Sequence, residues 1–266
     1  MGKLSGRDNR PIVNLLAFDT STETLSVALA WTAGGQAQRA LQESEGGREA
    51  SATLIPSVQA LLAQAGIALA DLHTIVFGRG PGSFTGLRTA CAVAQGLALG
   101  AQRPVLPVDT LMAVAEDARA RLGCTQVLAA LDARMGEVYA CAYRHGASGW
   151  QAQAEVTLGA PESLVLPPGF VLAGNVQAAY GERLPAPALP ARPCAGALLR
   201  LAPALIATGQ ARPADQALPL YVRDKVAQTT AERDAAKVGA TLGATAHASP
   251  TAAPSQGLTL DSHSRP

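Results

Sequence analysis

The sequence predicts an α/β fold, and three observations lead to this class. The pattern of residues 12–31 indicates a strand, a polar turn and an antiparallel strand, with Asp19 at the end of the first strand. Residues 127–143 repeat the pattern, with Asp132 in the corresponding place. Segments of helical periodicity alternate with strands between and after these two hairpins, which is typical of α/β proteins.

The two hairpins favour an internal duplication of the chain. When they are aligned, Asp19 lies opposite Asp132. A coincidence of two hairpins is the alternative, and the hairpin pattern alone leaves it open. The helices between the hairpins favour duplication. Because 266 residues exceed one average domain, we expect two lobes of about a hundred residues each.

Two helices are predicted in the first lobe. Residues 48–65 place apolar side chains on one face at helical spacing, with Ser51 as the expected N-cap and Gly66 as the expected stop. Residues 74–77 indicate a strand, and residues 85–99 indicate the second helix. The first helix suits either the surface of its own domain or half of an intermolecular helix bundle.

The second half of the chain gives weaker signals. We expect helices over residues 111–122 and 195–207, a strand over residues 170–173, and proline-rich loops between them. From Gln228 onward the chain has no aromatic residue. The predicted organisation is a disordered N-terminus over 1–11, a first lobe over 12–103 joined by the closing helix near 195–209, a second, reduced lobe over 104–194 and 210–235, and a disordered tail over 236–266.

Composition narrows the classes of function. Hydrophobic residues make up 48% and charged residues 15% of the chain, which favours a globular protein. The net charge of +1 lacks the positive excess of a dedicated nucleic-acid binder, so any RNA contact is expected through a partner. The cysteines have neither zinc-ribbon nor redox spacing, and no apolar run approaches the roughly 18 residues of a membrane span. We expect a soluble, cytoplasmic protein.

A glycine-rich run at a predicted strand-to-helix junction is the most specific segment. Such a junction exposes backbone amides at a helix N-terminus, which is a natural anion site. Glycines that only permit a tight structural turn are the alternative. No Gly-Lys-Ser/Thr closes the run, so it is not a P-loop. The residues of this candidate turn are Gly78, Gly80, Pro81, Gly82, Ser83, Gly86 and Arg88.

The helix after this run is rich in small residues. Glycine in a helix interior costs about 1 kcal/mol relative to alanine, so close contact with another element is expected to offset it. That element is either this chain's own sheet or a second chain, and both can hold on opposite faces. Two ridges of small residues run along the helix: Gly86, Ala90, Ala94 and Ala98, and Ala92, Gly96 and Gly100.

Several separated motifs closely resemble the TsaB family, also called YeaZ. They are residues 16–23, 78–88 with 95–100, 128–139 and 220–223, in the family's order and spread over about residues 15–230. The resemblance implies the duplicated ribonuclease-H-like, two-lobe fold of the actin-like ATPase superfamily. It also implies a non-catalytic role in the N6-threonylcarbamoyladenosine modification of the adenosine next to the anticodon, in tRNAs that read ANN codons.

The resemblance further implies a set of partners. Such proteins pair with the paralogue TsaD, which holds the metal and transfers the threonylcarbamoyl group, and they work with the ATPase TsaE. A homodimer is expected when the chain is alone, and tRNA is expected to be contacted only through TsaD. The helices matching residues 48–65 and 85–100 are the pairing elements, and relatives commonly carry a histidine where this chain has Ala50. The expected interface residues are Leu54, Val58, Leu61, Leu62, Gly86, Ala90, Val93, Ala94 and Leu97.

The first polar turn bears on catalysis. In this superfamily the turn holds nucleotide phosphate, and active members usually need glycine there so that the backbone can approach the phosphate. Here the turn has no glycine, so no cofactor, metal or catalytic residue is predicted. The weak candidates for a vestigial phosphate loop are Asp19, Thr20, Ser21 and Thr22.

Two enzymatic alternatives remain. A small-molecule kinase of the same superfamily would use Asp19 or Asp132 to orient magnesium or to act as a base. A glycoprotease-like peptidase is the weaker alternative, because no histidine accompanies Ser21, Ser83 or Cys91 in a recognisable pattern. The four histidines also do not pair at metal-ligand spacing.

Overall fold

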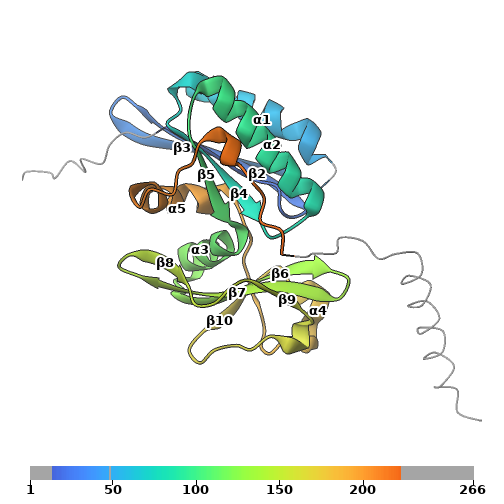
Figure 1. The fold of residues 1–266 in the computed structure, drawn as a ribbon. Helices are drawn as coiled ribbons and strands as arrows, with labels where there is room; N and C mark the ends of the chain where they lie inside the picture. The colour runs from blue at the N-terminus through green and yellow to red at the C-terminus, as the bar shows by residue number, and fades with distance from the viewer. Residues whose placement is uncertain (1–13, 48, 223–266) are drawn as a thin grey trace, which may run out of the picture. The chain divides into compact units, whose positions relative to one another are not determined.

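The computed structural model describes residues 14–47 and 49–222. The predicted disordered N-terminus over 1–11 and the predicted tail over 236–266 lie outside the described residues. The described part contains two β-sheets with helices packed on them (Figure 1). None of its helices is long and apolar enough to cross a membrane.

The first sheet has the strand order β3-β2-β1-β4-β5. β2 pairs antiparallel with both β1 and β3, whereas β1, β4 and β5 run parallel. The sequence predicted β1, β2 and β4 but not β3, which is polar, or β5, which is short and contains Pro107. The strands are β1 (Leu15–Asp19), β2 (Thr24–Ala33), β3 (Gln36–Glu45), β4 (Thr74–Gly80) and β5 (Val105–Asp109).

The second sheet repeats this topology and confirms the predicted duplication. Its order is β8-β7-β6-β10-β11, in which β6 and β7 take the places of β1 and β2. β6 pairs antiparallel with β7 and parallel with β10. The extra strand β9 pairs with β7. The strands are β6 (Gln126–Arg134), β7 (Glu137–Gly146), β8 (Gly149–Ala152), β9 (Thr157–Gly159), β10 (Val171–Gly174) and β11 (Leu189–Pro190).

The helices lie on both faces of the first sheet. α1 and α2 lie side by side on one face, and α5 packs on the other face against β1, β2 and β4 (Figure 1). α3 packs on the second sheet and also against α5, so both helices lie between the sheets. The helices are α1 (Ala50–Ala65), α2 (Phe84–Ala101), α3 (Thr110–Leu122), the short α4 (Gln177–Tyr180) and α5 (Ala195–Ala207).

The predicted helix ends are partly right. α1 begins at Ala50 after Glu49, so the expected N-cap at Ser51 is wrong, because Ser51 already lies in the first turn. α1 stops at Gly66 as expected, with φ of 67° in the left-handed region that glycine adopts readily. α5 has the predicted bounds.

Alternating side chains of the central strands build separate cores. Leu16 and Phe18 of β1 join the core under α1 and α2, while Leu15 and Ala17 join the core that contains α3 and α5. Alternate side chains of β6 are likewise divided between two cores, and Leu128 joins a third core on the far face of the second sheet. This period of two explains why the opening strand of each hairpin is apolar throughout.

Candidate functional site

Asp19 lies at the end of β1, and its side chain is fully buried. Ser21 donates hydrogen bonds to Asp19 Oδ1 from its backbone N–H (2.9 Å) and from its hydroxyl (2.6 Å). Asp19 Oδ2 has no hydrogen-bond partner among the residues that the structure describes. Burial raises the pKa of the Asp19 carboxyl, against the lowering effect of both bonds from Ser21. The carboxyl is therefore held inside the protein and does not face an open ligand site.

The polar turn after β1 packs directly against the glycine-rich run. The Thr20 hydroxyl donates to the Gly86 carbonyl (2.7 Å), and the Ser83 backbone N–H donates to the Ser21 carbonyl (2.8 Å). A Cβ atom added at Gly82 would lie 2.5 Å from the Ser21 carbonyl oxygen, and one at Gly86 would lie 1.9 Å from that of Thr20. Backbone atoms therefore fill the space between turn and run. Thr22, the last candidate of this turn, is half-buried and accepts a hydrogen bond from the next strand.

The earlier part of the run is packed just as closely. A Cβ atom at Gly78 would lie 1.8 Å from Asp19 Oδ2. Gly80 has a φ of 117°, which glycine adopts readily, and its N–H donates to the Thr110 hydroxyl (3.0 Å). A Cβ atom at Gly80 would lie 2.7 Å from the Leu220 carbonyl oxygen. Contacts within the chain thus account for these glycines, and this favours the structural-turn interpretation over an anion site.

A segment near residue 220 crosses the start of α2, a contact that sequence reasoning missed. The Leu220 N–H donates to the Arg79 carbonyl (2.7 Å). Arg88 donates to the Tyr221 hydroxyl (3.2 Å), and its guanidinium lies 4.0 Å from the centre of the Phe84 ring. The two segments are separate motifs more than a hundred residues apart, so nothing local in the sequence indicates the contact. Arg88 of the candidate turn therefore holds this segment to α2.

Asp132 occupies the corresponding place in the second hairpin. Its carboxylate accepts hydrogen bonds from the Arg134 backbone N–H (2.8 Å) and from the Tyr180 hydroxyl (2.7 Å). Burial, followed by this bond, raises the pKa of Tyr180 to about 12. Asn175 accepts from the Asp132 backbone N–H, and Arg134 also forms an ion pair with Glu23 of the first hairpin. Both aspartates are thus engaged in holding their own turns.

The predicted interface residues lie mostly on the inner sides of α1 and α2. Only Val93 and Leu97 are half-buried; the other predicted interface residues are buried within this chain. Their side chains therefore cannot themselves form an exposed surface. Pairing through the two helices stays a prediction, but the exposed residues on these helices are different ones. The buried members are Leu54, Val58, Leu61, Leu62, Gly86, Ala90 and Ala94.

The outer side of the same helices forms an uncharged surface, here called the helix-pair surface. α1 contains no charged residue, and Arg88 is the single charged residue within α2. A Cβ atom added at Gly96 or Gly100 would meet nothing within 4 Å. The second small-residue ridge is therefore open, whereas the first is buried. The helix-pair surface consists of Ala52, Ile55, Pro56, Gln59, Ala60, Ala63, Ala92, Gly96, Leu99 and Gly100.

Comparison with known proteins assigns the family. Residues 36–230 match the family described as TsaD, tRNA N6-adenosine threonylcarbamoyltransferase. The tRNA threonylcarbamoyladenosine biosynthesis protein TsaB of Escherichia coli (strain K12) is 37% identical over 228 residues, which cover 81% of this chain and 96% of that protein. The chain belongs to the TsaB family.

Two further proteins agree with this assignment. The TsaB protein of Haemophilus influenzae is 42% identical over 127 residues, which cover 48% of this chain and 52% of that protein. The solved structure of YeaZ from Pseudomonas aeruginosa is 40% identical and has a TM-score of 0.72, covering 79% of this chain and 100% of that chain. The resemblance of the motifs to the TsaB family, and the fold it implied, are confirmed.

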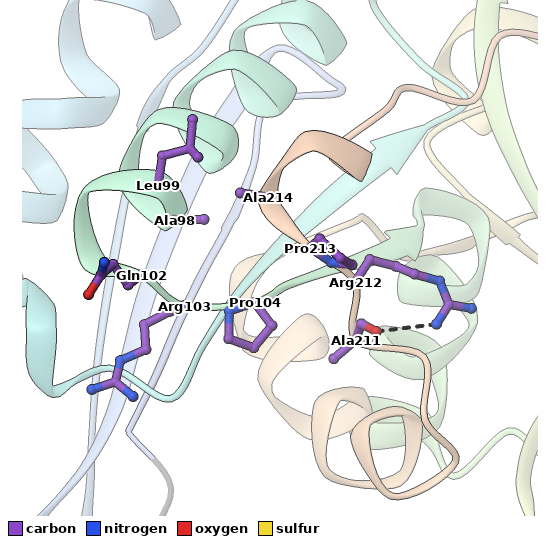
Figure 2. A pocket seen from close by; sticks show the side chains of 9 residues that line it. All are labelled: Ala98, Leu99, Gln102, Arg103, Pro104, Ala211, Arg212, Pro213 and Ala214. Atoms are coloured by element: carbon purple, nitrogen blue, oxygen red, sulfur yellow. Dashed lines mark hydrogen bonds between the residues drawn. The ribbon is translucent and has the colours of Figure 1, made fainter.

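An open pocket of about 560 Å³ continues the helix-pair surface of this TsaB-family chain at the C-terminal end of α2 (Figure 2). Leu99 of the surface borders it and is 63% exposed. Arg103 and Arg212 extend to opposite sides of the pocket (Figure 2). The pocket is lined by Ala98, Leu99, Gln102, Arg103, Pro104, Ala211, Arg212, Pro213 and Ala214.

Metal-ligating residue types are scattered in this TsaB-family chain. Within residues 14–47 and 49–222, no three His, Cys, Asp or Glu side chains form a group that could hold a metal ion. Cys91, a candidate nucleophile of the peptidase alternative, is buried on α2, and burial raises its pKa to about 11. A thiolate at this position is therefore disfavoured at neutral pH.

Proposed function

We propose that this chain is the non-catalytic partner subunit of TsaD in the biosynthesis of threonylcarbamoyladenosine on tRNA. The names of the E. coli and H. influenzae relatives place those proteins in this pathway. The match to the TsaD family suits a paralogue of the transferase that shares its fold. The observation that carries the partner role is the helix-pair surface, with its open glycine ridge.

The cost in helix stability of the glycines on the open ridge supports a partner on this surface. Glycine at Gly96 weakens α2 by about 1 kcal/mol relative to alanine. At Gly86 the contact with Thr20 explains the glycine, but no atom of this chain would meet a side chain at Gly96. A second helix that lies directly on the ridge gives Gly96 and Gly100 a purpose, because only small residues let two helix backbones approach closely.

The absence of charge on the surface points the same way. Charged residues are depleted at the centres of protein interfaces, and apolar contacts there exclude water. Ile55 and Leu99 are 43% and 63% exposed on this surface. We infer that a helix pair of TsaD covers it in the complex, and that a second copy of this chain covers it when TsaD is absent. TsaE joins this assembly, and tRNA is bound through TsaD, in keeping with a net charge of +1.

The closed turn supports a non-catalytic role. In a kinase of this superfamily, the turn after the first aspartate must accept phosphate. In this chain Thr20 and Ser21 bond instead to the glycine-rich run, and Asp19 is buried beneath them. Opening this arrangement would break those hydrogen bonds. These contacts weigh against the kinase alternative.

Charge on the helix-pair surface is expected to weaken binding to TsaD at least about fivefold. Ala92→Glu and Ala60→Glu place a carboxylate on α2 and α1 at exposed positions, so folding should be retained. In the complex the carboxylate would be buried without a partner, at a loss of about 1 to 3 kcal/mol of binding free energy. Titration calorimetry with purified TsaD measures the dissociation constant, and circular dichroism checks the fold.

Ala147→Glu is the matched control for this experiment. It makes the same change at an exposed position in the turn between β7 and β8 of the other sheet, and it should leave TsaD affinity unchanged. If the two helix variants bind TsaD as well as the native chain, the partner surface lies elsewhere. If Ala147→Glu weakens binding equally, the loss is not specific to the helices.

The isolated chain is expected to bind no magnesium-ATP. The reason is the filled space between the turn and the glycine-rich run, described above for Gly82 and Gly86. Calorimetric titration of the purified chain should give only heats of dilution, and ATP hydrolysis should equal the buffer rate. Tight binding that Asp19→Ala abolishes would favour the kinase alternative over the partner role.

A further inference from the structure

Among the residues that the structure describes, no strand pairs with the outer edge of β3. β3 is the first strand of its sheet, and within this described part it pairs only with β2, over ten residues and without a register shift (Figure 1). Natural edge strands are often kept short, bulged, charged or interrupted by proline, because an open edge pairs readily with another chain. β3 is long and regular and contains no proline. Its backbone is therefore available for strand addition.

One hydrogen bond shows which residues of β3 direct their backbone N–H and C=O groups away from β2. The Gly46 N–H donates to the Glu23 carbonyl in continuation of the β2–β3 register, so even-numbered residues face β2. Because backbone groups alternate along an antiparallel strand, the odd-numbered residues direct their N–H and C=O groups away from β2. These residues are Ala37, Arg39, Leu41, Glu43 and Glu45.

We propose that this edge pairs antiparallel with the same edge of a second copy of the chain, about a twofold axis at Leu41. In that register Leu41 of each copy opposes Leu41 of the other, and Arg39 opposes Glu43 in both directions. Moving the axis by two residues, to Arg39 or to Glu43, would place like charges opposite each other, which destabilises a sheet. Charge complementarity thus favours the twofold at Leu41 over one at Arg39 or at Glu43.

The surroundings of these three side chains fit the pairing. Leu41 is 55% exposed although it is apolar. Arg39, Leu41 and Glu43 alternate along the strand and so lie on one face of the sheet. Glu43 is already held by an ion pair with Arg192 and by a hydrogen bond from Ser26, so its carboxylate has a fixed position. A second copy would cover the leucine and place an arginine beside this carboxylate.

This surface is separate from the helix-pair surface and does not depend on the proposed function. α1 and α2 cover one face of the sheet, whereas the proposed pairing uses its edge. A dimer formed only through the helices would leave β3 unpaired. Cross-linking at β3 therefore distinguishes the two modes.

Oxidative cross-linking of Leu41→Cys in the full chain tests the proposal. Opposed residues of a hydrogen-bonded antiparallel pair have Cα atoms about 5.5 Å apart, within the range of a disulfide. We expect Leu41→Cys to form a covalent dimer under mild oxidation. The control Ala37→Cys should not, because the two copies of residue 37 would lie roughly 27 Å apart. The native chain, with its four cysteines, gives the background.

Reversing the charge at Arg39 gives an independent test of the proposed pairing. Ala92→Glu weakens association through the helix-pair surface, so the test is made in a chain that carries this change. There Arg39→Glu places glutamate opposite glutamate in both cross-strand pairs and should weaken the remaining self-association at least tenfold in analytical ultracentrifugation, with an unchanged circular dichroism spectrum. Equal cross-linking at positions 37 and 41, or none at 41 above background, would overturn the proposal. So would an Ala92→Glu chain that stays monomeric at millimolar concentration, or one whose self-association is unchanged when Arg39→Glu is added.

Discussion

Replacing Glu116 by glutamine is expected to lower the free energy of unfolding by about 3 kcal/mol. Glu116 lies on α3 and is 2% exposed. Its carboxylate accepts two hydrogen bonds from Arg119 (2.8 and 2.9 Å), one from Arg200 of α5 (2.8 Å) and one from the Trp150 indole of β8 (3.0 Å). Glutamine keeps the shape but leaves two arginines without their counter-charge. Because both arginines are partly exposed, the loss should lie at the lower end of the range for broken buried pairs.

The same carboxylate should make stability depend on acidic pH. Burial raises the pKa of Glu116, but hydrogen bonds from Arg119, Trp150 and Arg200 outweigh that effect, so its pKa is lowered in the folded chain. The unfolded chain therefore takes up the proton first on acidification. The stabilisation is complete above the ordinary carboxyl pKa of 4.5 and is lost as pH falls through the folded value. Glu116→Gln should lack this component.

Urea unfolding followed by tryptophan fluorescence measures both effects, because Trp150 contacts the carboxylate directly. The control is Glu162→Gln, which breaks the ion pair between Glu162 and Arg183. The Glu162 side chain is 54% exposed and the Arg183 side chain is 48% exposed. This variant should unfold like the native chain, because exposed pairs contribute little. Equal stability of Glu116→Gln and the native chain at neutral pH would contradict the prediction.

The sequence predicted the apolar parts of the fold well because their periodicity is local. Both duplicated hairpins, the strand at Thr74 and all four long helices follow from apolar patterns or turn residues. The sequence did not predict β3 because this edge strand is half-buried on one face only and there mostly by polar residues, and because its pairing is set by the hairpin at Gly34 and Gly35. The Glu116 network escaped because its members lie on α3, β8 and α5. Nothing within one segment indicates that they meet.

Most of the interface residues predicted on α1 and α2 are buried within this chain, for a related reason. Both helices carry apolar or small side chains on both faces. Their periodicity therefore identifies two faces but does not indicate which of them packs on the sheet. The larger side chains, such as Leu54 and Leu61, were taken for the partner surface. The structure places them in the core and leaves alanine and glycine outside. Burial of the larger apolar side chain is the physically favoured choice, since it removes more apolar surface from water.

Replacing glycine by alanine at Gly86 and at Gly96 of α2 is expected to change the free energy of unfolding in opposite directions. Gly86→Ala is expected to lower the free energy of unfolding by about 3 kcal/mol or more. Its Cβ atom would lie 1.9 Å from the Thr20 carbonyl oxygen, and backbone atoms cannot move aside as a flexible side chain can. The hydrogen bond from the Thr20 hydroxyl to the Gly86 carbonyl (2.7 Å) would be strained as well.

Gly96→Ala is the matched control, because its Cβ atom meets nothing within 4 Å. Alanine should there stabilise the isolated chain by about 1 kcal/mol through its higher helix propensity. Thermal and urea unfolding of both variants measure the difference. Under the proposed function Gly96→Ala should also bind TsaD more weakly than the native chain, because the added methyl group separates the two helix backbones. A Gly86→Ala variant as stable as the native chain would mean that the turn at Thr20 yields easily. The space between turn and glycine-rich run would then be open to a ligand after all.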